Sequence, residues 1–62
     1  MKVKEVIAII KSDGWYFKRQ KGSHMVFKHP TKRGIVVVPD HGANQDLAYG
    51  TENSILKQAR LK

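Results

Sequence analysis

The sequence predicts a single α+β domain in which a helix, three strands and a second helix follow one another along the chain. Three observations lead to this prediction. The chain has 62 residues, enough for one small hydrophobic core. Its first and last segments place apolar residues at helical spacing, whereas three central segments are rich in aromatic and β-branched residues. We therefore expect residues 1–62 to form one domain built on a three-stranded antiparallel sheet.

Residues 2–13 are expected to form the first helix. Their apolar side chains fall at positions i, i+3, i+4 and i+7, which gives the helix one apolar stripe. This stripe consists of Val3, Val6, Ile7 and Ile10. Gly14 then favours an end to the helix, because glycine readily adopts the left-handed conformation that often follows a helix C-terminus.

The three predicted strands cover residues 15–19, 24–29 and 35–38. The first two should form a hairpin around Gly22, because glycine tolerates the positive φ angles of tight turns. Pro30 should end the second strand, since proline has no N–H to donate to a strand ladder. The third strand is a β-branched run and is the clearest strand of the chain.

Residues 40–50 are expected to form a loop, with a short helical turn at residues 45–48. Thr51 is a good N-cap for the final helix, and Glu52 complements the positive end of its dipole. The apolar face of this helix consists of Ile55, Leu56 and Ala59. Both helices can then cover one face of the sheet and leave the other open to a ligand. This element order is also that of the double-stranded-RNA-binding domain, which recognises RNA by shape, phosphates and 2′-hydroxyl groups.

Positive charge is concentrated in the middle of the chain. The 12 Lys and Arg residues exceed the 5 Asp and Glu residues by seven, which favours a polyanionic partner: nucleic acid first, an acidic protein second. No acidic residue occurs between Asp13 and Asp40. Six basic residues fall in that stretch: Lys18, Arg19, Lys21, Lys28, Lys32 and Arg33. The simpler alternative is a solvated basic face with no function.

Composition excludes several other classes of protein. Without cysteine the chain can form neither a disulfide framework nor a thiolate zinc site. No apolar run approaches the ~18–20 residues of a membrane span, and the charged start of the chain lacks the apolar stretch of a signal peptide. We expect a cytoplasmic protein with no membrane partner, no metal ion and no cofactor.

His24 is the candidate for proton transfer. Alternation along its strand places it on one face with Val26 and Lys28, opposite Met25 and Phe27. If the bulkier pair faces the core, His24 lies on the open face among the basic residues. An imidazole there can take a proton from a ribose 2′-hydroxyl or give one to the leaving 5′-oxygen, and RNA supplies its own nucleophile. The alternative is an exposed turn histidine without a function.

The other two histidines fit structural roles better. His29 precedes Pro30 and is expected to cap the strand end or to pack beneath the following loop. His41 fits a loop residue whose imidazole bonds to nearby backbone or to Asp40. No two histidines have the i, i+4 spacing of a helical metal site, so the sequence predicts none. Whether either of the two assists a reaction stays open at this point.

Five parts of the sequence form a specific combination. They are Asp13-Gly14-Trp15, Arg19-Gln20-Lys21-Gly22-Ser23-His24, Phe27-Lys28-His29-Pro30, Val37-Val38-Pro39 with His41, and Gly50-Thr51 with Ser54-Ile55-Leu56-Lys57-Gln58-Ala59. Over nearly the whole chain this combination resembles the HicA toxin family, small mRNA interferases of toxin–antitoxin modules. The chain departs from the family pattern at Glu52, where an apolar residue is usual, and at Arg60, where Ala-Gly-Leu would end the helix.

The resemblance implies an α-β-β-β-α fold like that of the double-stranded-RNA-binding domain and metal-independent endoribonuclease activity on mRNA. It implies one functional histidine, which maps onto His24, and a HicB-like antitoxin that binds tightly over this site. The free toxin would be a monomer, and its complex with the antitoxin a hetero-oligomer. We expect the residues around the hairpin to bind RNA: Lys18, Arg19, Lys21, Gly22, Ser23 and Lys28.

Two other functions remain open. A non-catalytic RNA-binding module of the same fold would bind RNA in a salt-dependent way and would not cleave it. A basic protein that mainly engages an acidic partner is the third possibility. Only a nuclease would lose a reaction when His24 is replaced.

Overall fold

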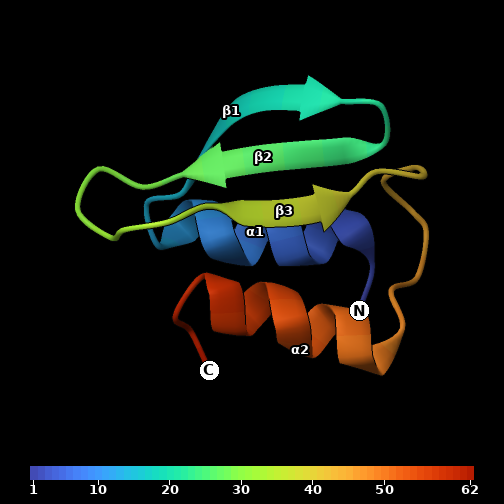
Figure 1. Cartoon of the computed structure of the whole chain (residues 1–62). Helices are drawn as coiled ribbons and strands as arrows, with labels where there is room; N and C mark the ends of the chain where they lie inside the picture. Colours follow the sequence, from blue (N-terminus) through green and yellow to red (C-terminus); the bar gives the residue numbers. More distant parts are fainter.

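A computed structural model, which describes residues 1–62, confirms the predicted α+β fold. The elements are α1 (Val3–Ser12), β1 (Tyr16–Lys21), β2 (His24–Lys28), β3 (Val36–Pro39) and α2 (Tyr49–Gln58). The strands form one antiparallel sheet in the order β1-β2-β3. In Figure 1 the sheet is seen from its open side, with α1 behind it and α2 along the edge formed by β3.

The core lies between the helices and one face of the sheet. The register pairs Phe27 with Val36 and Met25 with Val38, so these four side chains point to the same face. The core cluster draws on both helices, β2, β3 and the turn after α1: Val3, Val6, Ile10, Trp15, Phe27, Val36, Val38, Ile55 and Ala59. No residue of β1 is buried. β1 therefore stabilises the molecule through its pairing with β2 and leaves its side chains free for other contacts.

The end of α1 brings Trp15 into the core. Asp13 is the C-cap residue, and Gly14 follows with a φ of 110°. Two reasons exclude a side chain at Gly14. The positive φ is unfavourable for other residues, and a Cβ would lie 2.6 Å from Nε2 of His29. Trp15 is 1% exposed and packs in the core. It lies outside the sheet, and β1 begins one residue later than expected, at Tyr16.

Two expectations for the second half of the chain are wrong. Residues 45–48 form no helical turn, because the carbonyl oxygens of Ala43 and Gln45 accept hydrogen bonds from the first N–H groups of α1. This contact requires an extended loop. Thr51 is not the N-cap of α2, because the helix begins at Tyr49 with Ala48 as its N-cap, three residues earlier than predicted. The N–H of Leu47 bonds to the carbonyl of Met1, and this fixes the chain just before the helix.

Arg60 ends α2 in a conformation that suits glycine. Its φ is 58°, the only positive value at a non-glycine residue of the chain. Its N–H donates to the carbonyl of Lys57, and the N–H of Leu61 donates to the carbonyl of Leu56. These two hydrogen bonds form a Schellman motif, in which the residue at the position of Arg60 is usually glycine.

Replacing Arg60 with glycine should therefore stabilise the protein. We expect Arg60→Gly to raise the free energy of unfolding by about 0.5–1 kcal/mol, because it relieves the strain of the left-handed conformation. Glycine loses more conformational entropy on folding than arginine does, which offsets part of the gain. Urea unfolding measures this change. Arg60→Ala is the matched control, since it removes the charge but keeps the Cβ. Equal stabilisation by both variants would contradict the conformational explanation.

Candidate nucleic-acid interface

His24 is the first residue of β2 and lies on the open face of the sheet. In the register it is opposite Lys21 of β1 and Pro39 of β3. Its side chain is exposed, and the only imidazole engaged in hydrogen bonds or ion pairs is that of His29. The predicted position of His24 is thus confirmed, and both of its ring nitrogens are available to a ligand.

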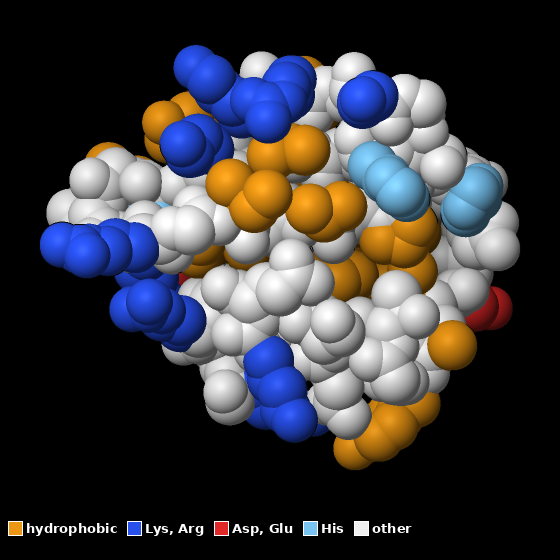
Figure 2. Space-filling model, in the orientation of Figure 1, with side chains coloured by type: hydrophobic (Ala, Val, Ile, Leu, Met, Phe, Trp, Pro, Cys, Tyr) orange, Lys and Arg blue, Asp and Glu red, His pale blue; other side chains and the backbone are white.

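Three basic side chains share the open face with His24. Residues that pair across two strands point to the same face, and Lys21 pairs with His24 while Arg19 pairs with Val26. Lys28 joins them because alternate residues of β2 point the same way. Figure 2 shows basic side chains gathered over β1, along one border of this face. Lys21 is directly opposite the exposed imidazole, whereas Arg19 and Lys28 lie farther along the strands.

Lys18 occupies an irregular place in β1. The register shifts between Phe17 and Arg19, so that no residue of β2 pairs with Lys18. All four basic residues of the hairpin that we expect to bind RNA are exposed, and none of them forms an ion pair. Unpaired cations on a surface without acidic residues attract polyanions, and this attraction weakens as salt is added.

Aliphatic side chains occupy the middle of the open face. Val26 pairs with Val37 and is only 8% exposed, although it points away from the core. Ile35, just before β3, is exposed. Figure 2 shows hydrophobic side chains between the basic border and the side chains over α2. The alternation of β2 predicted which face Val26 shares but not that its neighbours would cover it.

Asp40 holds the loop after β3 against the β1–β2 turn. Its N–H donates to the carbonyl of Ser23, which extends the pairing of β2 and β3 by one step. Its carboxylate accepts a hydrogen bond from Nε2 of Gln20 at 3.1 Å and one from the N–H of Gly42 at 3.3 Å. His41 is thereby held at the end of the sheet where His24 lies. Its imidazole forms no bond to Asp40, contrary to our expectation.

His29 has a structural role, as the sequence suggested. Its Nδ1 accepts hydrogen bonds from the N–H groups of Thr31 and Lys32, both at 3.1 Å. Nδ1 therefore carries no proton, and Nε2–H donates to the carbonyl oxygen of Asp13 at 2.6 Å. The side chain is 8% exposed and its ring meets Trp15 edge to face. With both ring nitrogens occupied, His29 caps the loop between β2 and β3 and offers nothing to a substrate.

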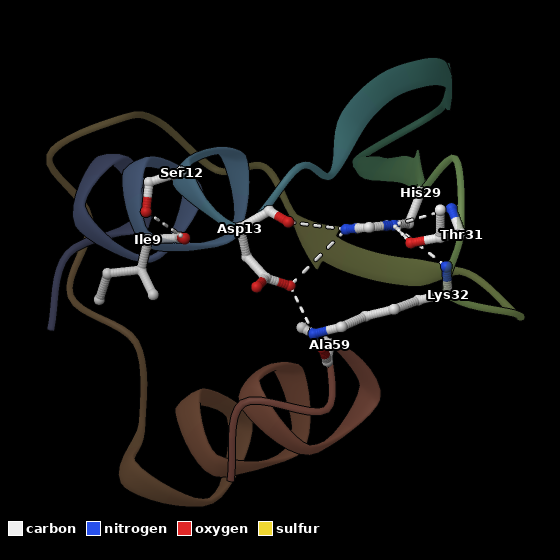
Figure 3. Close-up of polar contacts among 7 residues, drawn as sticks. All are labelled: Ile9, Ser12, Asp13, His29, Thr31, Lys32 and Ala59. Atoms are coloured by element: carbon white, nitrogen blue, oxygen red, sulfur yellow. Dashed lines mark hydrogen bonds and ion pairs between the residues drawn. The ribbon is translucent and has the colours of Figure 1, made fainter.

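Lys32 is a basic residue of the central stretch whose ammonium is bound within the protein and is not available on the open face. Its Nζ lies 2.6 Å from the carboxylate of Asp13 and 3.2 Å from the carbonyl oxygen of Ala59 (Figure 3). The hydrogen bond and charge of Lys32 lower the pKa of Asp13, against the opposing effect of partial burial. The buried indole N–H of Trp15 has no hydrogen-bond partner in the protein.

Comparison with known families decides which family this chain represents. A family model described as the HicA toxin of bacterial toxin–antitoxin systems matches residues 3–61. The chain belongs to the HicA toxin family. A search of curated proteins found no match. Family membership gives the protein a toxin role and implies an antitoxin partner. No helix has both the length and the apolar character needed to span a bilayer.

Two site features of this HicA toxin were not predicted from the sequence. Gln20 positions Asp40, but a strand glutamine between basic residues gives no signal that its amide reaches a loop twenty residues away. The pairing of Asp13 with Lys32 also joins distant segments. The sequence offered one signal for this pairing. Asp13 is the last acidic residue before the basic stretch, and the next is Asp40.

The stability of this HicA toxin should fall in acid because of Asp13. Its folded pKa is lowered, so the stability that its charge contributes is complete above its unfolded pKa of about 3.9 and is lost as the pH falls through the folded value. Urea unfolding of wild type between about pH 2 and 7 should show this loss, and Asp13→Asn should show a flatter profile. Asp46→Asn is the control, because the Asp46 side chain is 78% exposed. Identical profiles for Asp13→Asn and wild type would contradict this account.

Proposed function

We propose that this toxin is an endoribonuclease that cleaves mRNA without a metal ion, with His24 exchanging protons with the substrate. The observation that carries the proposal is an unengaged imidazole on an open, basic face whose strands contain no acidic residue. The toxin role comes from membership of the HicA family. An RNA substrate accounts for the surplus of unpaired positive charge on that face.

The hairpin supplies the groups that hold the RNA backbone. Lys18, Arg19, Lys21 and Lys28 contact phosphates. Gly22 has a φ of 58° and no heavy atom within 4 Å of the place where a Cβ would lie, so a phosphate can approach its backbone closely. The Ser23 hydroxyl, which has no partner within the protein, donates to a phosphate oxygen. These contacts are independent of base sequence, since they involve the sugar–phosphate backbone alone.

His24 acts on the phosphodiester that these groups hold. The ribose 2′-oxygen attacks phosphorus, a new O–P bond forms, and the bond from phosphorus to the 5′-oxygen breaks. The proton of the 2′-hydroxyl leaves, and the 5′-oxygen gains a proton. His24 performs one of these transfers, and the water around this exposed site performs the other. The ammonium of Lys21, opposite His24 in the sheet, or that of Lys28 offsets the negative charge that grows on the phosphate oxygens.

A HicB-like antitoxin inhibits this activity by covering the same face. The positive charge that attracts RNA also attracts an acidic protein. Ile35 and the partly exposed Val37 add apolar surface, which protein partners bury and a phosphate backbone does not. The free toxin is a monomer in this proposal, and the inhibited form is a hetero-oligomer.

One observation favours a second candidate, a non-catalytic RNA-binding module. Catalytic histidines are commonly oriented by a hydrogen bond to their second ring nitrogen, and His24 receives none. A module of this kind would use the same basic face, and His24 would be one more surface contact.

Cleavage by a His24 variant distinguishes the two functions. We expect His24→Ala to lower the rate of cleavage of single-stranded RNA by about 100-fold or more in the presence of a chelator, because general acid–base catalysis contributes a factor of roughly 10²–10⁴. RNA binding should change little. The measurement is the appearance of fragments from end-labelled RNA.

His41→Ala is the matched control for this experiment. It removes an exposed imidazole from the same end of the sheet without touching His24, so its rate should stay close to that of wild type. Equal cleavage by wild type and His24→Ala would remove His24 from the mechanism. RNA binding by wild type without any cleavage would favour the non-catalytic module.

A further inference from the structure

The surface of α2 contains a shallow hollow whose residues have no part in the function proposed above. It has a volume of about 580 Å³ and is lined by Gly50, Asn53, Ser54, Lys57 and Gln58, which we call the α2 hollow. None of these residues is hydrophobic. Oε1 of Gln58 accepts a hydrogen bond from the N–H of Val37 at 3.1 Å, which places the hollow beside the outer edge of β3. It therefore borders the open face on the side opposite β1, because α2 runs along β3 and away from β1 (Figure 1).

Each side-chain oxygen of the α2 hollow already accepts one hydrogen bond within the protein. Gln58 uses Oε1 for Val37, and its Nε2 donates to Oγ of Ser54 at 3.3 Å. Oδ1 of Asn53 accepts a hydrogen bond from Lys62, which can only donate. Each acceptor atom thus receives a hydrogen bond from a neighbour.

The donors of the α2 hollow remain free. The hydroxyl hydrogen of Ser54 and the amide hydrogens of Asn53 have no acceptor in the protein. The ammonium of Lys57 forms no ion pair or hydrogen bond. The N–H of Gly50, in the first turn of α2, is also without a partner. The nearby carboxylate of Glu52 pairs with the amino terminus at 3.7 Å.

We propose that the α2 hollow binds a phosphate group of the RNA, as a second contact with the backbone across the open face from β1. The groups of the hollow that lack any partner are donors, and its side chains carry one positive charge and no negative charge, which fits an anionic oxygen cluster. It lacks the apolar side chains that form the centre of a protein interface, which favours RNA over an acidic protein. This inference rests on the proposed function, since it assumes that RNA is the ligand of the open face.

RNA binding by variants of the α2 hollow tests the proposal. All proteins carry His24→Ala so that the RNA stays intact, and binding of a labelled single-stranded oligonucleotide is followed by fluorescence anisotropy over a range of salt concentrations. Lys57→Gln should weaken binding about three- to fivefold. It should also reduce the slope of log K against log salt by about 0.7, the value for one phosphate contact on a single strand.

Ser54→Ala should weaken binding about two- to fivefold without changing the slope, because it removes a neutral donor. Lys11→Gln and Ser12→Ala are the matched controls. They make the same chemical changes at exposed positions of α1, which lies behind the sheet and away from its open face, and should leave both affinity and slope unchanged. The thermal unfolding midpoint of each variant checks that it is folded.

Three outcomes would overturn the proposal, and they are distinguishable. If Lys57→Gln and Ser54→Ala bind as tightly as their controls on α1, the hollow has no role in RNA binding, while the proposed function stands. If Lys57→Gln weakens the binding of polyglutamate as much as the binding of RNA, the hollow accepts any polyanion and its assignment to RNA is wrong. If the His24→Ala parent binds no RNA, the proposed function fails and the phosphate site fails with it.

Discussion

The open face of this toxin depends on the hydrogen bonds that Asp13 accepts. The backbone carbonyl of Asp13 accepts from the His29 imidazole, and its carboxylate accepts from Lys32, which also reaches the end of α2 at Ala59. One residue at the end of α1 thus joins the β2–β3 loop to both helices. The sheet is covered on one face only, and these contacts hold the loop between β2 and β3 against the helices that cover it.

The contacts of Asp13 also give similar side chains different roles, because some become structural and others remain available to a ligand. Lys32 and His29 lie in the same acid-free stretch as Lys28 and His24, and nothing in their local sequence separates the two pairs. Folding occupies the first pair completely and leaves the second pair exposed. The surface that remains is basic, carries the unengaged imidazole of His24, and is bordered by a hollow of free donors on α2. This combination fits a sugar–phosphate backbone.

The sequence predicts those features that local patterns determine. The stripe of α1, the β-branched run of β3 and the alternation of β2 were sufficient to predict the fold and to put His24 on the open face. Features that depend on contacts between distant segments were beyond its reach. The start of α2 was misplaced because Met1 anchors Leu47, and the loop before it is extended because it caps α1. The α2 hollow was likewise not predictable, since it depends on which acceptors Val37 and Lys62 occupy.

The central claim is that the open face holds an RNA backbone while the RNA cleaves itself with the help of His24. The chemical identity of the new RNA ends tests this claim most directly. The account predicts fragments that end in a 2′,3′-cyclic phosphate and begin with a 5′-hydroxyl, formed in the presence of a chelator and lost in the His24→Ala variant. Fragments that begin with a 5′-phosphate would contradict it, because they require an external water as the nucleophile.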